Sequence, residues 1–588
     1  MIAPNITYLW SSLIIEELVR CGVTRFCISP GYRNTPLVLA AAENPGVDST
    51  IHVDERGAAF YAIGYAKACG KPVALICTSG TAVANYFPAI IEASQSTTPL
   101  IVLTADRPIE LRDTGANQTI DQVDIYGRYS RWSVDLPKPS AAVSADFILT
   151  TVDQAAYRAR RAPAGPVHLN CQFAEPLTPE QDDSIPTMYR SKITGWENDV
   201  APYTEYAQPR IEPTVDMWDN ISNMIAESRR GIIVAGCLGA EQDSAITSVL
   251  SKDLKMPLLA CVSSGLRFSR EVSDNLISTY DLILRDSRIS SRLRPDLILH
   301  LGGPIVSRTL AKYVENSGAR YIVVNETPFR QDAGHCVSVR IEMDPGSFCR
   351  GLRGYDASGE SELLPLFKQL DSICTDELNS LHAASSITNE FAVARELLKL
   401  IPSDCGLFLA NSMPVRDADG CGFKTSRSIS VGVNRGASGI DGNIASAVGF
   451  AQGLERRTVL LIGDLAFLHD LNSLFLVRQS QYPMTIVLIN NNGGGIFSLL
   501  PIADQTERFE TFFGTPHGVD VQHASSLFDI HYSRARSTAE FISLCQDSFA
   551  GGKSSIIEVR TDRQQNAKEH RDIWDRVSDA IGKHFRQD

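Results

Sequence analysis

The sequence lacks the features that mark membrane, secreted and disulfide-linked proteins. No run of about 18 apolar residues occurs, so a membrane-spanning helix is not expected. The first residues, MIAPNITYLW, have neither the basic segment nor the uninterrupted apolar segment of a secretory signal. The 13 cysteines are scattered without a CxxC pair or a cluster with histidine. That pattern favours buried thiols in a reducing compartment over disulfides or metal ligands, and the absences together predict a cytoplasmic protein.

An excess of positive charge is also missing. The net charge is −13, and the acidic residues are spread without long blocks. Nucleic acid and anionic membranes attract basic surfaces, so neither is expected as a main partner. A complete G-x-G-x-x-G fingerprint is absent too, because Gly236, Gly239 and residues 302–303 supply only parts of one. This disfavours a dinucleotide site and favours a Rossmann-like domain with a structural role.

What the sequence does contain is an alternation of apolar strands and helices. With 588 residues, 44% of them hydrophobic and 21% charged, the chain is long enough for about three domains with large cores. Near-continuous apolar strands between helices are typical of parallel sheets covered by helices. We expect three doubly wound α/β domains at residues 1–180, 213–375 and 387–588, with a linker at 181–212 that is rich in Pro, Asp and Thr. The first and third domains share one alternating plan, which indicates a duplicated module.

Residues 51–70, IHVDERGAAFYAIGYAKACG, place one carboxylate, Glu55, at the start of a helix lined by small residues. A buried carboxylate costs several kcal/mol unless it is paired or hydrogen bonded. The ordinary interpretation is a helix N-terminus, where the helix dipole favours acids. A functional carboxylate is the alternative.

Residues 458–497 form a second unusual stretch, with two apolar strands, a helix between them and the loop NNNGGGIF. Asp464 and Asn491 stand at the carboxyl ends of these strands, which lie side by side in a βαβ unit. A carboxylate, an amide oxygen and the turn carbonyl of Gly493 are hard oxygen ligands of the kind that Mg²⁺ prefers. An ordinary βα turn uses the same residue types, so the stretch alone leaves both interpretations open.

Together the two stretches resemble the thiamine-diphosphate enzymes. In that family a Glu of one domain hydrogen-bonds N1′ of the cofactor's aminopyrimidine, and a G-D-x-x-F…N-N segment of another domain holds the metal and the diphosphate. Here that segment reads GDLAF from Gly463, followed by Asn491 and Asn492. The resemblance implies thiamine diphosphate with Mg²⁺ or Mn²⁺, and three domains that are pyrimidine-binding (1–180), central (213–375) and diphosphate-binding (387–588). The resemblance implies these cofactor-binding residues: Glu55, Ser438, Gly439, Ile440, Asp464, Asn491 and Gly493. Of these, Glu55 is also catalytic, and Asp464, Asn491 and Gly493 bind the metal.

Four further segments narrow the resemblance. Residues 29–37, 104–122, 434–442 and 490–501 are similar to the family of 2-succinyl-5-enolpyruvyl-6-hydroxy-3-cyclohexene-1-carboxylate synthases of menaquinone biosynthesis. That family implies a transferase that decarboxylates 2-oxoglutarate and joins the succinyl carbanion to isochorismate by 1,4-addition. It also implies a homodimer or homotetramer with active sites at the subunit interface, where Glu55 of one chain faces Asp464 of another.

Both implied substrates are dianions, and Arg recognises carboxylates through two parallel hydrogen bonds. The loops at predicted strand ends supply Arg33, Arg107, Arg416 and Arg435. We expect these four to hold substrate and not to build the fold, although a surface ion pair is the ordinary alternative for any one of them. The resemblance adds the remaining substrate-binding candidates: Tyr32, Gln118, Arg308, Ser412, Ile496, Phe497 and Leu500. Of these, Tyr32 stands where the family usually has Ser, and Arg308 where it usually has Lys.

Three other functions stay open at this point. One is a different thiamine-diphosphate enzyme acting on 2-oxo acids, such as an acetolactate synthase or a decarboxylase, which has fewer substrate carboxylates to bind. Another is a nucleotide-dependent dehydrogenase, which the incomplete glycine pattern disfavours. The last is a non-catalytic binding or scaffold protein, against which the presence of Glu55, Asp464 and Asn491 argues.

Overall fold

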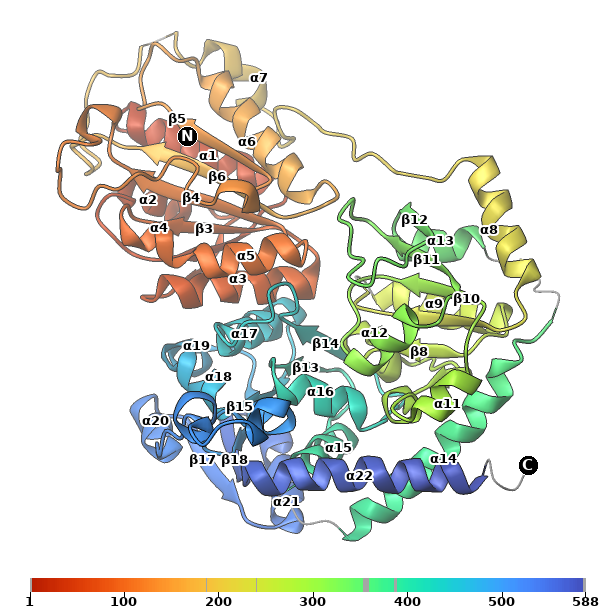
Figure 1. Cartoon of the computed structure of the whole chain (residues 1–588). Helices are drawn as coiled ribbons and strands as arrows, with labels where there is room; N and C mark the ends of the chain where they lie inside the picture. The colour runs from red at the N-terminus through yellow and green to blue at the C-terminus, as the bar shows by residue number, and fades with distance from the viewer. Residues whose placement is uncertain (1–2, 187, 239–240, 353–358, 385–388, 585–588) are drawn as a thin grey trace. The chain divides into compact units, whose positions relative to one another are not determined.

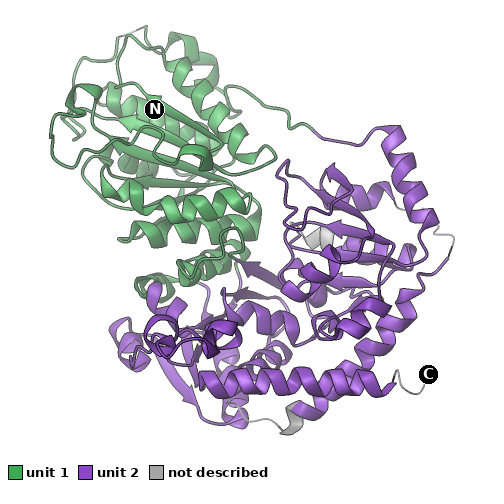
Figure 2. Cartoon of the chain, viewed as in Figure 1, with its two compact units in different colours: residues 1–209, 434–455, 470–481 green, residues 210–433, 456–469, 482–588 purple. Residues whose placement is uncertain are grey.

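Three parallel sheets of six strands each organise the chain, and helices connect the strands (Figure 1). The computed structural model describes residues 3–186, 188–238, 241–352, 359–384 and 389–584. By its internal contacts the chain divides into two compact units (Figure 2). Unit 1 comprises residues 1–209, 434–455 and 470–481, and unit 2 comprises residues 210–433, 456–469 and 482–588.

The sheet of unit 1 has the order β2-β1-β3-β4-β6-β5. Helices α1, α2 and α6 cover one face through a core that includes Trp10, Leu13 and Leu149, and helix α3 packs against the sheet at β1 and β3. The central strands are buried along their whole length, as expected for a parallel sheet between helices. The strands are β1 (Arg25–Ile28), β2 (Asp48–Ile51), β3 (Val73–Cys77), β4 (Leu100–Asp106), β5 (Trp132–Leu136) and β6 (Pro166–Gln172). The helices are α1 (Ile6–Arg20), α2 (Thr35–Glu43), α3 (Glu55–Cys69), α4 (Thr81–Asn85), α5 (Phe87–Gln95), α6 (Ala145–Arg160), α7 (Thr194–Glu197), α17 (Asn443–Leu454) and α19 (Leu474–Gln479).

Unit 2 contains the other two sheets, with orders β12-β11-β10-β7-β8-β9 and β14-β13-β15-β16-β18-β17. One continuous apolar core joins them, with members from both sheets and from the helices between them. The strands are β7 (Gly231–Ala235), β8 (Leu258–Ala260), β9 (Leu276–Ile277), β10 (Leu297–Leu301), β11 (Arg320–Asn325), β12 (Val339–Glu342), β13 (Cys405–Leu409), β14 (Ile429–Val433), β15 (Thr458–Gly463), β16 (Met484–Asn490), β17 (His531–Ala535) and β18 (Ser555–Arg560). The helices are α8 (Val215–Glu227), α9 (Glu241–Asp253), α10 (Tyr280–Ile283), α11 (Ser287–Arg292), α12 (Arg308–Glu315), α13 (Pro345–Gly351), α14 (Leu363–Ala384), α15 (Glu390–Leu400), α16 (Met413–Gly420), α18 (Asp464–His469), α20 (Val521–Leu527), α21 (Thr538–Ala550) and α22 (Arg563–His584).

The first and third sheets share one strand order, since each runs second, first, third, fourth, sixth, fifth in chain order. All pairs within them are parallel. This agrees with the duplicated module that the sequence indicates. The doubly wound three-sheet architecture that we expected is therefore confirmed.

Helix α17 follows the second strand of the third sheet in sequence, yet it packs along α3 within unit 1. Glycines allow the two helices to approach closely. A Cβ on Gly64 would lie 1.9 Å from the carbonyl oxygen of Ser446, and a Cβ on Gly449 would lie 1.9 Å from that of Tyr61. No larger residue fits at either position without moving a backbone. The helix that begins with Glu55 is thus fixed in place by backbone-to-backbone contact.

The glycines of the second sheet serve packing. A Cβ on Gly236 would lie 1.9 Å from the carbonyl oxygen of Gly303, so the ends of β7 and β10 touch where a phosphate-binding turn would have to open. Gly239 lies outside the described residues. The structural interpretation of this glycine pattern is therefore favoured over a nucleotide site.

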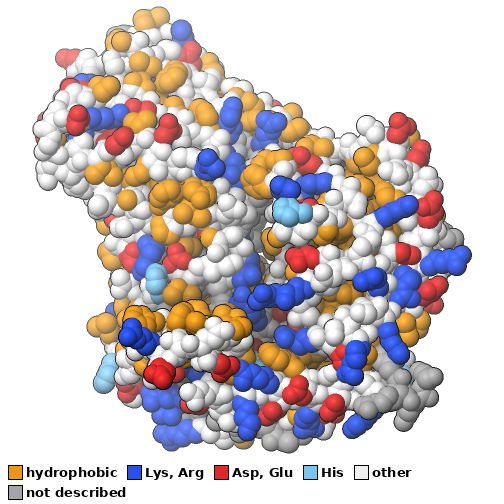
Figure 3. Space-filling view, in the orientation of Figure 1, with side chains coloured by type: hydrophobic (Ala, Val, Ile, Leu, Met, Phe, Trp, Pro, Cys, Tyr) orange, Lys and Arg blue, Asp and Glu red, His pale blue; other side chains and the backbone are white. Residues whose placement is uncertain are grey.

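Acidic and basic side chains are interspersed over the face of the molecule drawn in Figure 3, in keeping with a net charge of −13 that is not concentrated in blocks. Among the described residues, no helix has both the length and the apolar character needed to cross a bilayer.

The segment expected as a linker is partly attached to unit 1. It contains α7, whose Trp196 is buried and donates its indole N–H to Glu17 at 2.5 Å. The backbone N–H of Tyr203 donates to the other oxygen of Glu17 at 2.6 Å, and that of Thr204 donates to Asp153 at 2.9 Å. Two buried acids of α1 and α6 therefore anchor this segment.

Candidate active site

The carboxyl ends of β15 and β16 bring Asp464 and the glycine loop together. The two strands pair in register from Thr458 with Met484 to Gly463 with Ile489, so Asp464 lies beside the start of the loop. The N–H of Gly493 donates to Oδ2 of Asp464 at 2.9 Å, and the N–H of Leu465 donates to Oδ1 at 2.7 Å. Asp464 is 2% exposed, and burial raises the pKa of its carboxyl group. Among the described residues no Lys or Arg side chain bonds this carboxylate, and a buried carboxylate without such a partner is suited to a metal ion.

Asn491 begins the loop that bonds this carboxylate through Gly493, and it offers a free acceptor. Its Nδ2 donates to Oε1 of Glu390 at 2.9 Å, whereas its buried Oδ1 has no hydrogen-bond partner in the part of the chain that the structure describes. Buried amide oxygens are almost always satisfied, so an orphaned one points to a missing ligand. Gly493 has a φ of 141°, and a Cβ there would lie 1.9 Å from the carbonyl oxygen of Gly514. The residues expected to hold a divalent ion therefore fit that role in their chemistry and in the backbone that carries them.

The segment after β16 folds back over this loop. Nε2 of His517 lies 3.3 Å from Oδ2 of Asp464. The side chain of Asn492 accepts hydrogen bonds from the N–H groups of His517 at 3.0 Å and Gly518 at 2.8 Å. Sequence reasoning did not single out His517, since nothing in the spacing relates it to Asp464.

Glu55 is the first residue of α3 and is partly exposed. The helix is capped by its neighbour Asp54, which accepts hydrogen bonds from the N–H groups of Arg56 at 3.1 Å and Gly57 at 3.4 Å. Asn85 Nδ2 donates to Oε2 of Glu55 at 3.2 Å. The capping role thus belongs to Asp54, and the Glu55 carboxylate is available for another partner.

The loop at residues 434–442 is held within unit 1 by a buried acid. Glu92 of α5 accepts hydrogen bonds from the N–H groups of Gly436 at 3.0 Å and Ala437 at 2.7 Å. Lys67 of α3 donates to Glu92 at 3.0 Å and to the side chain of Asn434 at 2.9 Å. Beyond this anchor, Ser438 has a φ of 59°, and the side chain of Ile440 is 38% exposed. Arg435 and Gly439 lie on the same loop, so Ile440, which we expect to bind the cofactor, lies on a turn held by hydrogen bonds to Glu92.

Arg33 and Arg107 converge at the carboxyl edge of the first sheet. Arg33 donates to the carbonyl oxygen of Phe173 at 3.0 Å and to Glu175 at 3.1 Å, while its buried Nε has no partner among the residues that the structure describes. Arg107 hydrogen-bonds Ser79 and the carbonyl oxygen of Gln118. Burial and the positive charge of Arg33 lower the pKa of Arg107. Two neighbouring cations of this kind make a site for an anion.

These contacts correct one expectation. Arg33 and Arg107 are only 7% and 8% exposed and bond backbone carbonyls of their own chain, so both also contribute to the fold. Gln118 lies in the same place, with a φ of 55° and its Nε2 donating to the carbonyl oxygen of Ser79 at 2.8 Å. Tyr32, one residue before Arg33, is 61% exposed.

Unit 2 contains a cavity of about 1060 Å³ that gathers four of the expected substrate-binding residues. Arg308 from the first turn of α12 and Arg416 from α16 line it, together with Ile496 and Leu500 from the segment after the glycine loop. Ser412 precedes α16 with a φ of 72°, an uncommon conformation for a residue other than glycine, and its carbonyl oxygen accepts a hydrogen bond from Arg416 at 2.5 Å. Phe497 is not among the cavity-lining residues and packs edge-to-face against Phe513.

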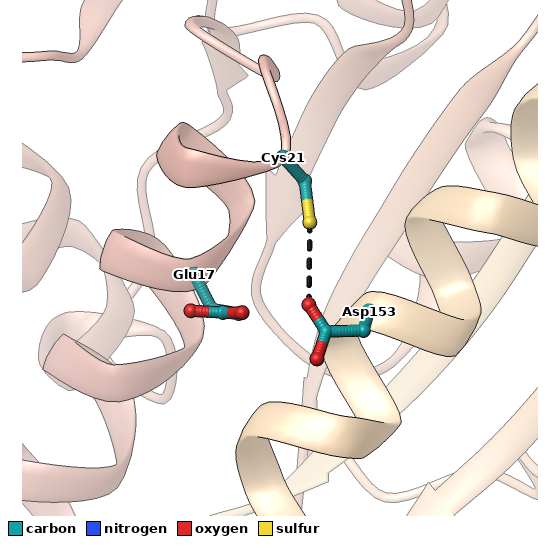
Figure 4. A group of neighbouring side chains, drawn as sticks. All are labelled: Glu17, Cys21 and Asp153. Carbon is teal, nitrogen blue, oxygen red and sulfur yellow. Dashed lines mark hydrogen bonds between the residues drawn. The ribbon is translucent and has the colours of Figure 1, made fainter. Parts of the chain in front are cut away.

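Within the described part of the chain, the residue types His, Cys, Asp and Glu form one group of three whose ligand atoms all lie within 4.8 Å: Glu17, Cys21 and Asp153 (Figure 4). Cys21 donates to Asp153 at 3.4 Å, and the remaining carboxylate oxygens accept from the indole and backbone N–H groups that anchor residues 196–204. Because protein donors already occupy these oxygens, the group is a structural anchor and not a metal site.

Comparison with known proteins shows which protein family and which fold the chain matches. The profile described as thiamine pyrophosphate enzyme, N-terminal TPP binding domain, matches residues 10–125, the middle domain of thiamine pyrophosphate matches residues 187–409, and the C-terminal TPP binding domain matches residues 423–559. A benzoylformate decarboxylase from Polynucleobacter necessarius superimposes with a TM-score of 0.71 at 17% identity, over 94% of this chain and 98% of that one. At that identity the likeness shows the fold alone.

Curated relatives are closer in sequence. The 2-succinyl-5-enolpyruvyl-6-hydroxy-3-cyclohexene-1-carboxylate synthase of Chlorobium phaeobacteroides (strain BS1) is 44% identical over 99% of both chains. The enzyme of the same name from Rubrobacter xylanophilus is 42% identical over 97% of this chain and 98% of the relative. The chain therefore belongs to the 2-succinyl-5-enolpyruvyl-6-hydroxy-3-cyclohexene-1-carboxylate synthase family of thiamine pyrophosphate enzymes.

Proposed function

We propose that this chain decarboxylates 2-oxoglutarate and joins the remaining four-carbon unit to isochorismate by 1,4-addition, as the synthase step of menaquinone biosynthesis. The observation that supports the cofactor half of this proposal is the orphaned Oδ1 of Asn491, two residues before Gly493, whose N–H bonds the buried carboxylate of Asp464. The arginines of both units support the binding of two substrates that carry carboxylates. Membership of the family supports the reaction itself.

Thiamine diphosphate, when bound, supplies the carbon nucleophile that attacks the keto carbon of 2-oxoglutarate and stabilises the charge left as carbon dioxide departs. Asp464, Asn491 and the carbonyl of Gly493 would hold Mg²⁺ or Mn²⁺. Glu55 would hydrogen-bond the aminopyrimidine ring, and its carboxylate is available because Asp54 caps α3. Ile440, on the turn with Ser438 and Gly439, would contact the cofactor.

The substrate carboxylates are assigned to cations. Arg33 and Arg107 form one cationic pair, supported by the unpartnered Nε of Arg33 and by the lowered pKa of Arg107. Arg308 and Arg416 face one cavity, which is large enough for a small dianion and has apolar walls from Ile496 and Leu500. Apolar walls exclude water, which keeps the reacting carbon from being protonated before it meets isochorismate. The proposed substrate site also includes Arg435, Gln118, Ser412, Tyr32 and Phe497.

The assembly is also part of the proposal. In this family arrangement, Glu55 of one subunit serves the metal site of another, in a homodimer or homotetramer. The partly exposed position of Glu55 in the single chain supports a partner that covers it. The division into a pyrimidine-binding domain (1–180), a linker (181–212), a central domain (213–375) and a diphosphate-binding domain (387–588) belongs to the same proposal, as does a cytoplasmic location.

The test is turnover of the two substrates by purified protein, read by product mass. We expect product only when thiamine diphosphate and Mg²⁺ or Mn²⁺ are both present, and no product when either substrate is omitted. Pyruvate and benzoylformate serve as control substrates. Turnover of pyruvate in place of 2-oxoglutarate, or a yellow flavin spectrum in the purified protein, would instead favour an acetolactate synthase-like enzyme, and decarboxylation without transfer to isochorismate would favour a decarboxylase.

A further inference from the structure

Glu390 is a buried acid that no motif in the sequence singles out. It is the first residue of α15, where Asn389 supplies the N-cap, so its position alone is explained by the preference of helix starts for acids. Its side chain, however, is directed into the protein. Glu390 is 3% exposed, which is uncommon for a residue whose only task is to start a helix.

The contacts of Glu390 lead to the ends of two strands of the third sheet. Its Oε1 accepts one hydrogen bond from Nδ2 of Asn491 at 2.9 Å and another from Oγ1 of Thr561 at 2.8 Å. Asn491 directly follows β16 and Thr561 directly follows β18, and the N–H of Thr561 donates to the carbonyl oxygen of Asn490 at 3.0 Å. Glu390 is thus an acceptor at the ends of β16 and β18, and β16 leads directly into the loop of the proposed metal site.

This acceptor decides which way the Asn491 amide faces. A side-chain amide has a donor end and an acceptor end, and the two have nearly the same shape. An ionised carboxylate has acceptors only, so Oε1 of Glu390 presents an acceptor to Asn491 with or without the Thr561 hydroxyl group, and only the NH₂ end of the amide can satisfy it. The amide oxygen must then face the opposite way, where it is buried and has no partner among the described residues.

We propose that Glu390 is a positioning residue that turns the oxygen of Asn491 toward the divalent ion of the cofactor. The inference rests on the proposed metal site and adds to it a residue that does not touch the ion. A hydrogen bond from the NH₂ group to a carboxylate also makes the amide oxygen a better ligand, as outer partners do for other metal ligands. Without Glu390 the amide could turn its NH₂ group toward the ion, and a cation is not bound by a donor.

Two conservative variants separate the contact from the charge. Glu390→Gln keeps an oxygen that can accept from Asn491 and Thr561 but removes the charge. Glu390→Asp keeps the charge but withdraws the carboxylate by one methylene group, which breaks the 2.9 Å contact. The readout is the affinity of the protein for Mn²⁺, measured by electron paramagnetic resonance at saturating thiamine diphosphate, with the melting temperature of each variant without metal as the measure of fold.

We expect the Mn²⁺ affinity of Glu390→Gln to lie within about three-fold of that of the unmodified protein. We expect Glu390→Asp to bind Mn²⁺ about 10- to 100-fold more weakly, which is the range found when outer partners of metal ligands are removed. Thr561→Val is the matched control, since it removes the other donor to the same oxygen, and it should leave the affinity within about three-fold as well. In an Asn491→Ala background, Glu390→Asp should have no further effect, because the two residues act as a pair.

The proposal is overturned if Glu390→Asp binds Mn²⁺ as well as the unmodified protein, if Glu390→Gln is weakened as much as Glu390→Asp, or if Glu390→Asp weakens binding equally with Asn491 absent. Asp464→Ala distinguishes this failure from failure of the metal site itself. If Asp464→Ala abolishes Mn²⁺ binding while Glu390→Asp does not alter it, the metal site stands and the role of Glu390 is wrong. If Asp464→Ala also binds Mn²⁺ normally, the ion is held elsewhere and both assignments are wrong.

Discussion

The backbone N–H of Gly493 donates a 2.9 Å hydrogen bond to the carboxylate of Asp464, which ties the glycine loop after β16 to the end of β15. We propose that the same carboxylate binds the metal ion, so that one side chain would both shape the loop and hold the ion. This dual role would distinguish Asp464 from an acid that only neutralises charge.

Asp464→Ala should therefore weaken metal and cofactor binding together. Loss of a metal ligand removes the bridge to the diphosphate, and the loop loses its hydrogen-bond acceptor. We expect calorimetric titration to show at least about a ten-fold loss of thiamine diphosphate affinity in the presence of Mg²⁺, on the scale of losses at metal sites. Asp504→Ala, at an exposed acid of the same unit, is the control. Unchanged, metal-dependent affinity in Asp464→Ala would place the site elsewhere.

Glu55→Gln should reduce turnover by orders of magnitude while cofactor affinity changes little. The amide keeps the size of the side chain and a hydrogen-bond partner for Asn85, but it loses the carboxylate that we propose interacts with the aminopyrimidine ring in the reaction. Removing an interaction that matters in the transition state lowers kcat. The measurement is kcat at saturating cofactor, with Glu43→Gln, an exposed acid of unit 1, as control. Near-normal kcat in Glu55→Gln would show that the catalytic assignment is wrong.

Four arginines of the proposed substrate site, two in the cavity of unit 2 and two buried in unit 1, should divide into two classes. Arg308→Ala and Arg416→Ala should raise KM for at least one substrate by about 10- to 100-fold, the equivalent of a lost charge-assisted contact of about 1.5–3 kcal/mol. Both residues are exposed in the structure, so the melting temperature should hardly change. Arg33→Ala and Arg107→Ala should raise KM and also lower the melting temperature, because these side chains are buried and bond backbone carbonyls. Arg→Lys should rescue each only in part, since Lys lacks the planar fork.

Separate KM measurements for 2-oxoglutarate and isochorismate would divide the arginines between the two substrates. Arg270→Ala, at a 74% exposed side chain of unit 2, is the control and should be silent. If all four variants keep normal KM and kcat for both substrates, the proposed substrate contacts are wrong.

The anchor of residues 196–204 should loosen as the pH rises. Burial and the neighbouring Asp153 raise the pKa of Glu17 from about 4.5 to about 8. A group whose pKa is raised by folding stabilises the folded state fully below its unfolded pKa, and this stabilisation is lost as the pH rises through the folded value. Hydrogen exchange, corrected for the intrinsic rate, should thus show the amides of Tyr203 and Thr204 less protected at pH 9 than at pH 6. Glu17→Gln should remove most of this pH dependence and Glu16→Gln, the neighbouring acid of α1, should keep it. Equal protection at both pH values in the unmodified protein would contradict the assignment.

Much of the architecture follows from local pattern. Apolar strands alternating with helices indicate parallel sheets, and the turn residues after TVLLIGD and MTIVLIN mark two strand ends that the structure does place side by side. Strand order and helix partners depend on contacts distant in sequence, which local pattern does not contain. Helix α17 illustrates this: its sequence position assigns it to residues 387–588, whereas Gly64 and Gly449 let it pack on α3. Those glycines were the available signal, but in sequence they look like ordinary small residues of a helix.

In the candidate site, too, local sequence pattern predicts the residues near strand ends but not the contacts made by residues distant in sequence. Asp464, Asn491 and Gly493 are close in sequence to recognisable strand ends, and the resemblance names them. Glu390 and Glu92 reach the site loops from other helices, and each looks like a common helix acid until its buried partners are seen. The burial of Arg33 and Arg107 was likewise invisible, because a loop arginine in sequence gives no sign of which carbonyl groups lie around it.

The most direct test of the central claim uses 2-oxoglutarate labelled with carbon-13 at every carbon, together with unlabelled isochorismate, thiamine diphosphate and Mg²⁺. The reaction predicts that one labelled carbon leaves as carbon dioxide and that four enter the product, which should weigh four mass units more than the product from unlabelled substrate. Glu55→Gln and Asp464→Ala should both suppress this labelled product. Labelled carbon dioxide without labelled product, or a labelled product that forms equally well in those two variants, would contradict the account.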